Sequence, residues 1–79
     1  MKQLRKEIDK IDSQIVKLLD KRIKLSKQIG EYKKKNNLKI TDSKREKEVL
    51  KNVKKKSKNS AFVLKLYKLI IRESKRKQN

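Results

Sequence analysis

The sequence predicts an all-α protein of three helices, which are long, short and medium in chain order. Helix-breaking residues are scarce, because the 79 residues include no proline and one glycine. Apolar residues recur at helical spacing in three segments, and polar breaks separate these segments. The alternation of apolar and polar residues that marks a strand is absent.

The first helix is expected from about Lys2 to Lys35. Its apolar positions alternate between steps of four and three residues, which is the heptad pattern of a coiled coil. At about 1.5 Å per residue the helix would be roughly 50 Å long, so its apolar stripe must face other helices. The positions of this seam are Leu4, Ile8, Ile11, Ile15, Leu18, Arg22, Leu25, Ile29 and Tyr32.

A connector and a second, shorter helix follow. Asn36-Asn37 is expected to end the first helix, and the segment 38–41 forms the connector. The second helix runs to about Lys56, with an apolar face made of Val49, Leu50 and Val53. Its N-cap is one of Thr41, Asp42 and Ser43, and Ser43 has the spacing of a capping box with Glu46.

The polar run KKKSKNS separates the second helix from the third. Ser60 is the expected cap of the third helix, which continues from Ala61 to about Lys77. Its predicted face, at steps of four and three, consists of Val63, Tyr67, Ile70, Ser74 and Gln78.

Composition excludes several classes of chemistry. A chain of this length forms at most one domain, here residues 1–79, with a modest core. Cysteine and histidine are both absent. This excludes disulfides, zinc sites of the usual kind, thiol nucleophiles and imidazole acid–base catalysis. Self-association remains as a way to bury more surface.

The net charge of +18 attracts anions, which include nucleic acid, anionic membrane and small acidic substrates. No apolar run is long enough to span a membrane, and no signal peptide is visible, so we expect a cytoplasmic protein. Most of the basic residues are lysine, so each arginine suggests a specific role in gripping a carboxylate with its planar fork. The arginines are Arg5, Arg22, Arg45, Arg72 and Arg76.

Arg22 occupies a position of the apolar seam. It either sets the register of a coiled coil or forms a site for a buried anion. Lys33 lies eleven residues later, within about 20° of the same helix face and some 16 Å along the axis. The two cations could hold a small dianion between them, although Lys33 alone would pass for a surface lysine.

Arg5 lies about 25 Å from Arg22 along the helix axis, too far for one small ligand to touch both within one helix. An antiparallel pair of chains would bring Arg5 of one copy to the Arg22 site of the other. Solvation of Arg5 is the equally weighted alternative.

Polar residues also extend the apolar faces of the other two helices. Each is explained equally well by helix capping or by a fraying helix end when it is considered alone. Together with the seam they provide cations for carboxylates and hydrogen-bonding groups for a hydroxyl or ether, with no nucleophile and no metal cluster. Such a set suits catalysis by positioning and electrostatic stabilisation. These residues are Asp42, Arg45, Glu46, Ser74 and Gln78.

Three stretches in combination resemble the all-helical (AroQ-class) chorismate mutases. They are LRKEIDKIDSQIVKLLDKRIKLSKQIGEYK, then ITDSKREKEVL, then LYKLIIRES with a Gln four residues after the Ser. The shared pattern is L-R-x-x-I-D-x-I-D, R-x-x-L-x-x-x-I-G-x-x-K and D-x-x-R-E, and it is specific only in combination. The resemblance covers nearly the whole chain and implies an intertwined homodimeric helical bundle that converts chorismate to prephenate without a cofactor or metal.

The resemblance also implies roles for individual residues. Arg5 of the partner chain, Arg22 and Arg45 would hold the two carboxylates of the substrate, with help from Ser74 at one of them.

Lys33 would bind a carboxylate and the ether oxygen, and Gln78 would also bind the ether oxygen. Glu46, together with the backbone near Asp42, would hold the ring hydroxyl. The residues expected to act in catalysis are thus Lys33, Gln78 and Arg22.

Two other functions remain open. Isochorismate pyruvate lyase activity uses a similar cationic pocket, although the Arg45-Glu46 pair and the final Gln favour the mutase. A basic helical module that binds nucleic acid would fit the charge, but Tyr32, Phe62 and Tyr67 are the only aromatic residues and no known nucleic-acid motif is present. The preferred interpretation therefore includes neither a nucleic-acid partner nor a membrane.

Overall fold

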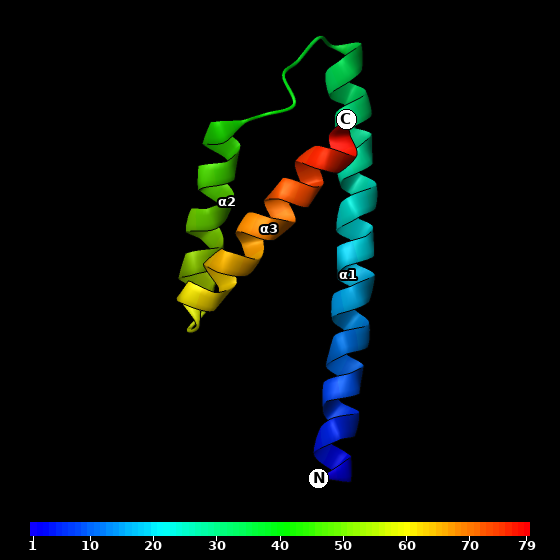
Figure 1. Ribbon diagram of the computed structural model, residues 1–79, viewed down its shortest axis with the longest axis vertical. Coiled ribbons are helices and arrows are strands. Elements are labelled where there is room, and N and C mark those ends of the chain that lie inside the picture. Colours follow the sequence, from blue (N-terminus) through cyan, green and yellow to red (C-terminus); the bar gives the residue numbers. More distant parts are fainter.

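A computed structural model describes residues 1–79 and contains three helices and no strand. Helix α1 spans Lys2–Lys35, α2 spans Ser43–Lys56 and α3 spans Ser60–Gln78. Figure 1 shows α2 and α3 as a hairpin beside α1, with α3 crossing diagonally so that its C-terminal end meets α1. Helix α3 packs against both other helices, whereas α1 and α2 do not pack on each other. The α3 helix therefore joins the two halves of the fold.

The first helix has the bounds that its heptad pattern predicts. At its C-terminal end the Asn36 side chain donates to the Tyr32 carbonyl at 2.8 Å. Asn37 then adopts a positive φ of 55°, a conformation that asparagine tolerates better than most residues. The chain leaves the helix here and continues through the connector to α2 (Figure 1).

Asp42, one of the three N-cap candidates from the sequence, caps α2. Its carboxylate accepts a hydrogen bond from the Arg45 backbone N–H at 3.0 Å. The capping box of Ser43 with Glu46 does not form, because Ser43 is already the first helical residue. The Glu46 carboxylate turns instead towards Lys75 of α3.

The prediction that Ser60 caps α3 is wrong. Asn59 occupies the N-cap position without a side-chain hydrogen bond, and Ser60 is the first helical residue. The preceding turn is held by Ser57, whose hydroxyl accepts from the Asn59 backbone N–H at 3.0 Å. At the other end the helix includes Gln78, one residue beyond the predicted end, and Gln78 is buried there.

The core of a single chain is very small. Four residues are buried, namely Ser26, Gly30, Ile71 and Gln78, and Ile71 is the only large apolar side chain among them. The N-terminal half of α1 has no neighbouring helix (Figure 1). Its seam residues are 47–65% exposed, and they are Leu4, Ile8, Ile11, Ile15 and Leu18. This N-terminal part of the apolar stripe is therefore left largely uncovered within the chain.

None of the three helices combines the length and the apolar character needed to cross a membrane.

Candidate active site

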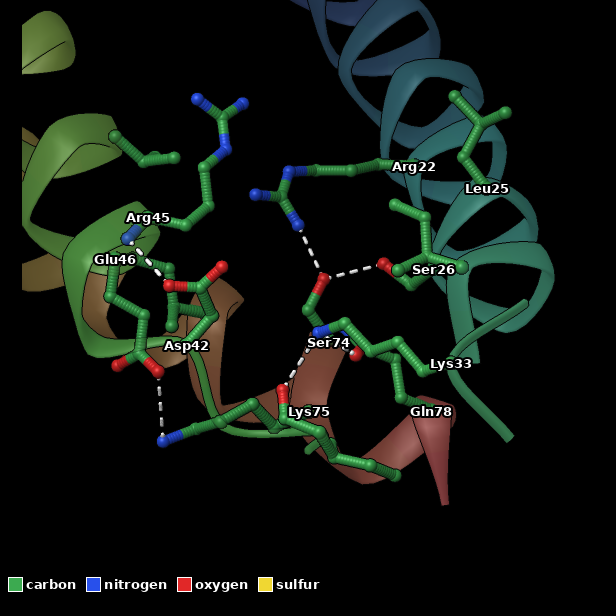
Figure 2. A pocket seen from close by; sticks show the side chains of 14 residues that line it. Arg22, Leu25, Ser26, Lys33, Asp42, Arg45, Glu46, Ser74, Lys75 and Gln78 are labelled. Carbon is green, nitrogen blue, oxygen red and sulfur yellow. Dashed lines mark hydrogen bonds and ion pairs between the residues drawn. The ribbon is translucent and has the colours of Figure 1, made fainter. Parts of the chain in front are cut away.

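A cavity of about 360 Å³ lies where the three helices and the connector converge (Figure 2). Its apolar wall consists of Leu25, Ile29, Ile40, Val49 and Ile71. Seven of the eight site residues predicted from the sequence line it, and they are Arg22, Lys33, Asp42, Arg45, Glu46, Ser74 and Gln78. The side chains of residues far apart in the chain thus line one open cavity.

Arg5 is the predicted site residue that does not line this cavity. It is exposed near the free end of α1. Within one chain the structure therefore separates Arg5 from Arg22, as their spacing along the helix predicts.

A chain of hydrogen bonds orients Arg22. Its guanidinium donates from Nη1 to the Ser74 hydroxyl at 2.5 Å, and Ser74 in turn shares a 2.5 Å hydrogen bond with Ser26. Ser26 is 4% exposed. One end of the guanidinium is therefore held by the protein, which leaves its other N–H groups for a ligand.

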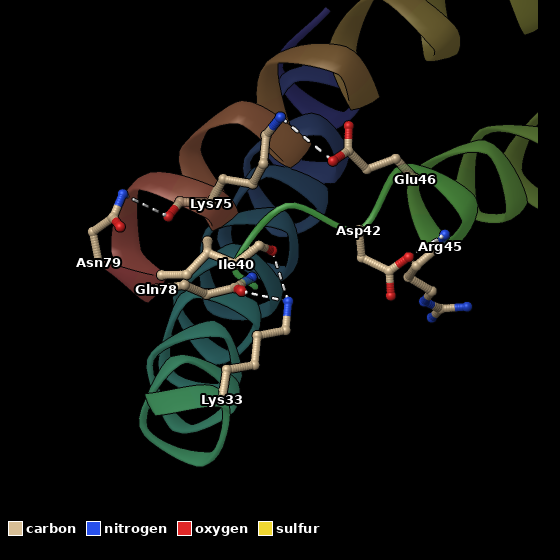
Figure 3. A network of polar contacts seen from close by, with 8 residues as sticks. All are labelled: Lys33, Ile40, Asp42, Arg45, Glu46, Lys75, Gln78 and Asn79. Carbon is tan, nitrogen blue, oxygen red and sulfur yellow. Dashed lines mark hydrogen bonds and ion pairs between the residues drawn. The ribbon is translucent and has the colours of Figure 1, made fainter. Parts of the chain in front are cut away.

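Lys33 and Gln78 form a second polar cluster (Figure 3). The Lys33 ammonium donates to the Ile40 carbonyl at 2.8 Å and to Gln78 Oε1 at 2.9 Å. Lysine carries three N–H donors, so one remains. Because the Gln78 oxygen is occupied as an acceptor, its amide N–H groups remain available as donors.

Gly30 allows Gln78 to reach this position. A Cβ atom on Gly30 would lie 2.5 Å from the Gln78 carbonyl oxygen and 2.6 Å from its Cα. The backbone of α3 thus lies against α1 at the one residue without a side chain, and this close approach places Gln78 beside Lys33.

Arg45 lies at the rim of the cavity. Its side chain is 61% exposed, and its guanidinium pairs with Glu48 at 2.6 Å. An exposed pair of this kind contributes at most about 1 kcal/mol. Arg45 can therefore exchange Glu48 for the carboxylate of a ligand at little cost.

Glu46 and Lys75 face each other across α2 and α3, with 3.4 Å between Glu46 Oε2 and Lys75 Nζ. Both residues line the cavity. Sequence reasoning missed Lys75, because it belongs to a lysine-rich run whose charges suit any helix C-terminus.

Sequence reasoning also missed Ser26, although a signal was present. Ser26 lies four residues after Arg22 and therefore on the same face of α1. A small polar residue next to a seam arginine is a candidate to orient it.

The cavity combines cationic groups, neutral donors and an apolar wall, and cations outnumber its two carboxylates, Asp42 and Glu46. Such a lining suits a small organic anion that also carries a hydroxyl or ether group. No group of three or more acidic residues is placed to hold a metal ion.

A family model described as chorismate mutase type II matches residues 4–79. The chain belongs to this family. Membership extends over all three helices, and it includes every residue that lines the cavity.

Two relatives are bifunctional chorismate mutase/prephenate dehydratases. The protein from Aquifex aeolicus is 51% identical over 53 residues, which are 67% of this chain and 15% of that protein. The protein from Buchnera aphidicola is 46% identical over 74 residues, which are 89% of this chain and 19% of that protein. The chain therefore spans less than a fifth of the length of either relative.

The fold also matches a solved structure of the conserved hypothetical protein Pfu-1581948-001 from Pyrococcus furiosus. The two chains are 44% identical with a TM-score of 0.84, and the match covers 99% of this chain and 93% of the other. The long helix and the crossing hairpin thus recur in this related protein.

Proposed function

We propose that this protein is a chorismate mutase and that residues 1–79 form a single mutase domain. It converts chorismate to prephenate by a Claisen rearrangement, in the route to phenylalanine and tyrosine. The observation that carries the proposal is the cavity, which brings seven residues of the predicted site together in a chain of this family.

The arginines hold the substrate in its reactive, folded conformer. Arg22 binds one carboxylate, with Ser74 keeping its guanidinium in place. Arg45 releases Glu48 to bind a carboxylate. Arg5 of the partner chain completes the set. Holding one conformer reduces the entropic part of the barrier to an intramolecular reaction.

Lys33 and Gln78 act on the ether oxygen, where negative charge builds as the C–O bond breaks and the C–C bond forms. Each retains an N–H donor after forming the contacts within the cluster. Donors that strengthen as this charge develops stabilise the transition state more than the ground state. Glu46 accepts a hydrogen bond from the ring hydroxyl and, together with the backbone near Asp42, holds this group in place. No cofactor enters this mechanism.

A homodimer completes the fold and the site. An apolar groove of about 520 Å³ runs between α1 and α3, and Ile15, Leu18 and Leu69 are among the residues that line it. Arg22 and Ser74 line both this groove and the site cavity. An antiparallel α1 from a partner would fill the groove, cover the exposed seam and bring its Arg5 to Arg22.

The first test is the loss of chorismate absorbance with purified protein, with the product identified by acid conversion to phenylpyruvate. Arg22→Ala and Lys33→Ala should each lower kcat/KM by about 100-fold or more, as loss of a charged group at the reacting centre does. Arg76→Ala is the matched arginine control, because this side chain is 75% exposed and outside the cavity. It should retain full activity.

Circular dichroism and sedimentation must show that the variants keep their helices and their oligomeric state. If the folded wild-type protein leaves chorismate unchanged but eliminates pyruvate from isochorismate, the proposed function would be isochorismate pyruvate lyase and not chorismate mutase. A folded protein inactive on both substrates that binds nucleic acid would favour the basic binding module. The cytoplasmic location expected from the sequence stays a prediction.

A further inference from the structure

The contact between Glu46 and Lys75 joins α2 to α3 on one side of the cavity (Figures 2 and 3). The Glu46 Oε2 atom that faces Lys75 is buried and has no hydrogen-bond partner. A buried carboxylate oxygen needs a compensating partner, and the Lys75 ammonium at 3.4 Å provides the positive charge. The direction of the Glu46 carboxylate therefore depends on Lys75.

The two oxygens of Glu46 have different surroundings. Oε2 is enclosed and faces Lys75, whereas Oε1 is not enclosed in this way and has no hydrogen-bond partner in the protein. A carboxylate held through one oxygen presents the other in a defined direction. Glu46 lines the cavity, so its free oxygen is an acceptor for a ligand there.

The surroundings of Lys75 favour this pairing. A small cavity of about 220 Å³ lies beside the pair, and Lys75 and Glu46 line both cavities. Lys68 and Arg72 also line the smaller cavity. Their positive charges disfavour movement of the Lys75 ammonium in that direction, and Glu46 attracts it.

We propose that Lys75 is a positioning residue, which sets the Glu46 carboxylate to accept a hydrogen bond from the ring hydroxyl of the substrate. This inference rests on the proposed mutase function. Lys75 does not touch the substrate in this scheme, and its effect on turnover passes through Glu46.

The kinetic test uses Lys75→Met, which keeps an unbranched side chain and removes the charge. The variant should lose about tenfold in kcat/KM for chorismate, mainly through a higher KM, because a hydroxyl contact made in both ground and transition state is weakened. Lys75→Arg should restore most of the loss. Lys68→Met is the matched control, because it removes the same charge from α3 at a lysine that does not pair with Glu46. This variant should remain within about twofold of wild type in kcat/KM.

Two comparisons separate positioning from a general structural effect. In a Glu46→Gln background, Lys75→Met should cause little further loss, because the acceptor it orients has already changed. With the chorismate analogue that lacks the ring hydroxyl, Lys75→Met and the wild type should behave alike. An equal loss in both backgrounds, or an equal loss on the analogue, would overturn the inference.

One measurement does not depend on turnover. The ¹³C resonance of the Glu46 side-chain carboxyl in the unliganded protein should shift in Lys75→Met and stay unchanged in Lys68→Met. If the wild type fails to convert chorismate, the proposed function fails, and this resonance still decides whether Lys75 sets the carboxylate. A resonance that is the same in wild type and Lys75→Met overturns the inference whatever the kinetics show.

Discussion

At the scale of single residues, the site depends on small side chains as much as on charged ones. Ser26 and Gly30 are both buried on α1, and each faces the C-terminal part of α3. Ser26 bonds to Ser74, which holds Arg22, and Gly30 lets the backbone at Gln78 approach. Residues that carry no charge thus orient Arg22 and let Gln78 reach Lys33.

Gly30→Ala should lower kcat/KM about tenfold or more, because its Cβ would meet the Gln78 backbone at 2.5 Å and push Gln78 away from Lys33. Intrinsic helix propensity acts in the opposite direction, since alanine favours a helix over glycine by about 1 kcal/mol. Steady-state kinetics and circular dichroism together should therefore show lost activity in a protein whose α1 is still helical.

Lys27→Ala is the control for this prediction, because Lys27 is exposed on the same helix and lines none of the cavities. If the effect passes through Gln78, then Gly30→Ala should add little to the loss caused by Gln78→Ala. Losses that multiply would show that Gly30 matters for another reason.

At the scale of elements, α3 links the parts of the site. It packs on both other helices, and its last two turns provide Ser74, Lys75 and Gln78. Helix α2 provides Arg45 and Glu46 from its first turn, directly after the connector. The cap that begins α2 therefore lies within the site itself.

Asp42→Ala should lower the free energy of unfolding by about 1 kcal/mol, because the Arg45 backbone N–H loses its acceptor. Loosening of the first turn should also lower activity, since Arg45 and Glu46 belong to it. Urea unfolding followed by circular dichroism measures the first effect, and the chorismate assay measures the second.

Asp42→Asn is the matched variant, because asparagine caps helices about as well as aspartate. It should retain stability and most activity if the side chain acts only as a cap. A large loss of activity in a stable Asp42→Asn protein would show that the carboxylate itself takes part in binding.

At the scale of the whole molecule, one chain is an open structure. It measures 53 × 23 × 15 Å, and much of its long axis is the exposed half of α1. With four buried residues, one chain buries little apolar surface to offset the conformational entropy lost on folding. The proposed dimer would bury the seam and bring the one distant arginine to the site.

Mixing Arg5→Ala chains with Arg22→Ala chains tests the shared site. Each variant alone should be nearly inactive. If Arg5 serves the partner's site, the mixed dimer has one site with both arginines and one with neither. Random reassembly should then recover about a quarter of wild-type activity, since half of the dimers are mixed and half of their sites are intact.

Reassembly must be shown by subunit exchange, for example with chains of different mass tags. Wild-type chains mixed with Arg22→Ala chains provide the reference for exchange. No recovery in an exchanged mixture would place Arg5 outside the partner's site.

The sequence alone determined the three helices and the identity of half of the residues that line the cavity. The helices follow from local properties, namely heptad spacing, polar breaks and the scarcity of proline and glycine. These properties predicted both ends of α1 correctly and the ends of the other helices within one residue. The motif spacing also predicted seven residues that line one cavity. Their roles in binding and catalysis remain predictions.

Only the tertiary structure decided which of several chemically similar residues occupies each position at the site or at a helix end. Nothing local distinguishes Lys75 from its lysine neighbours until Glu46 lies 3.4 Å away. Asp42 caps α2 in preference to Ser43, and the Glu46 side chain that a capping box would use faces α3. These outcomes depend on contacts between residues distant in the chain, and a pattern along one helix does not contain them.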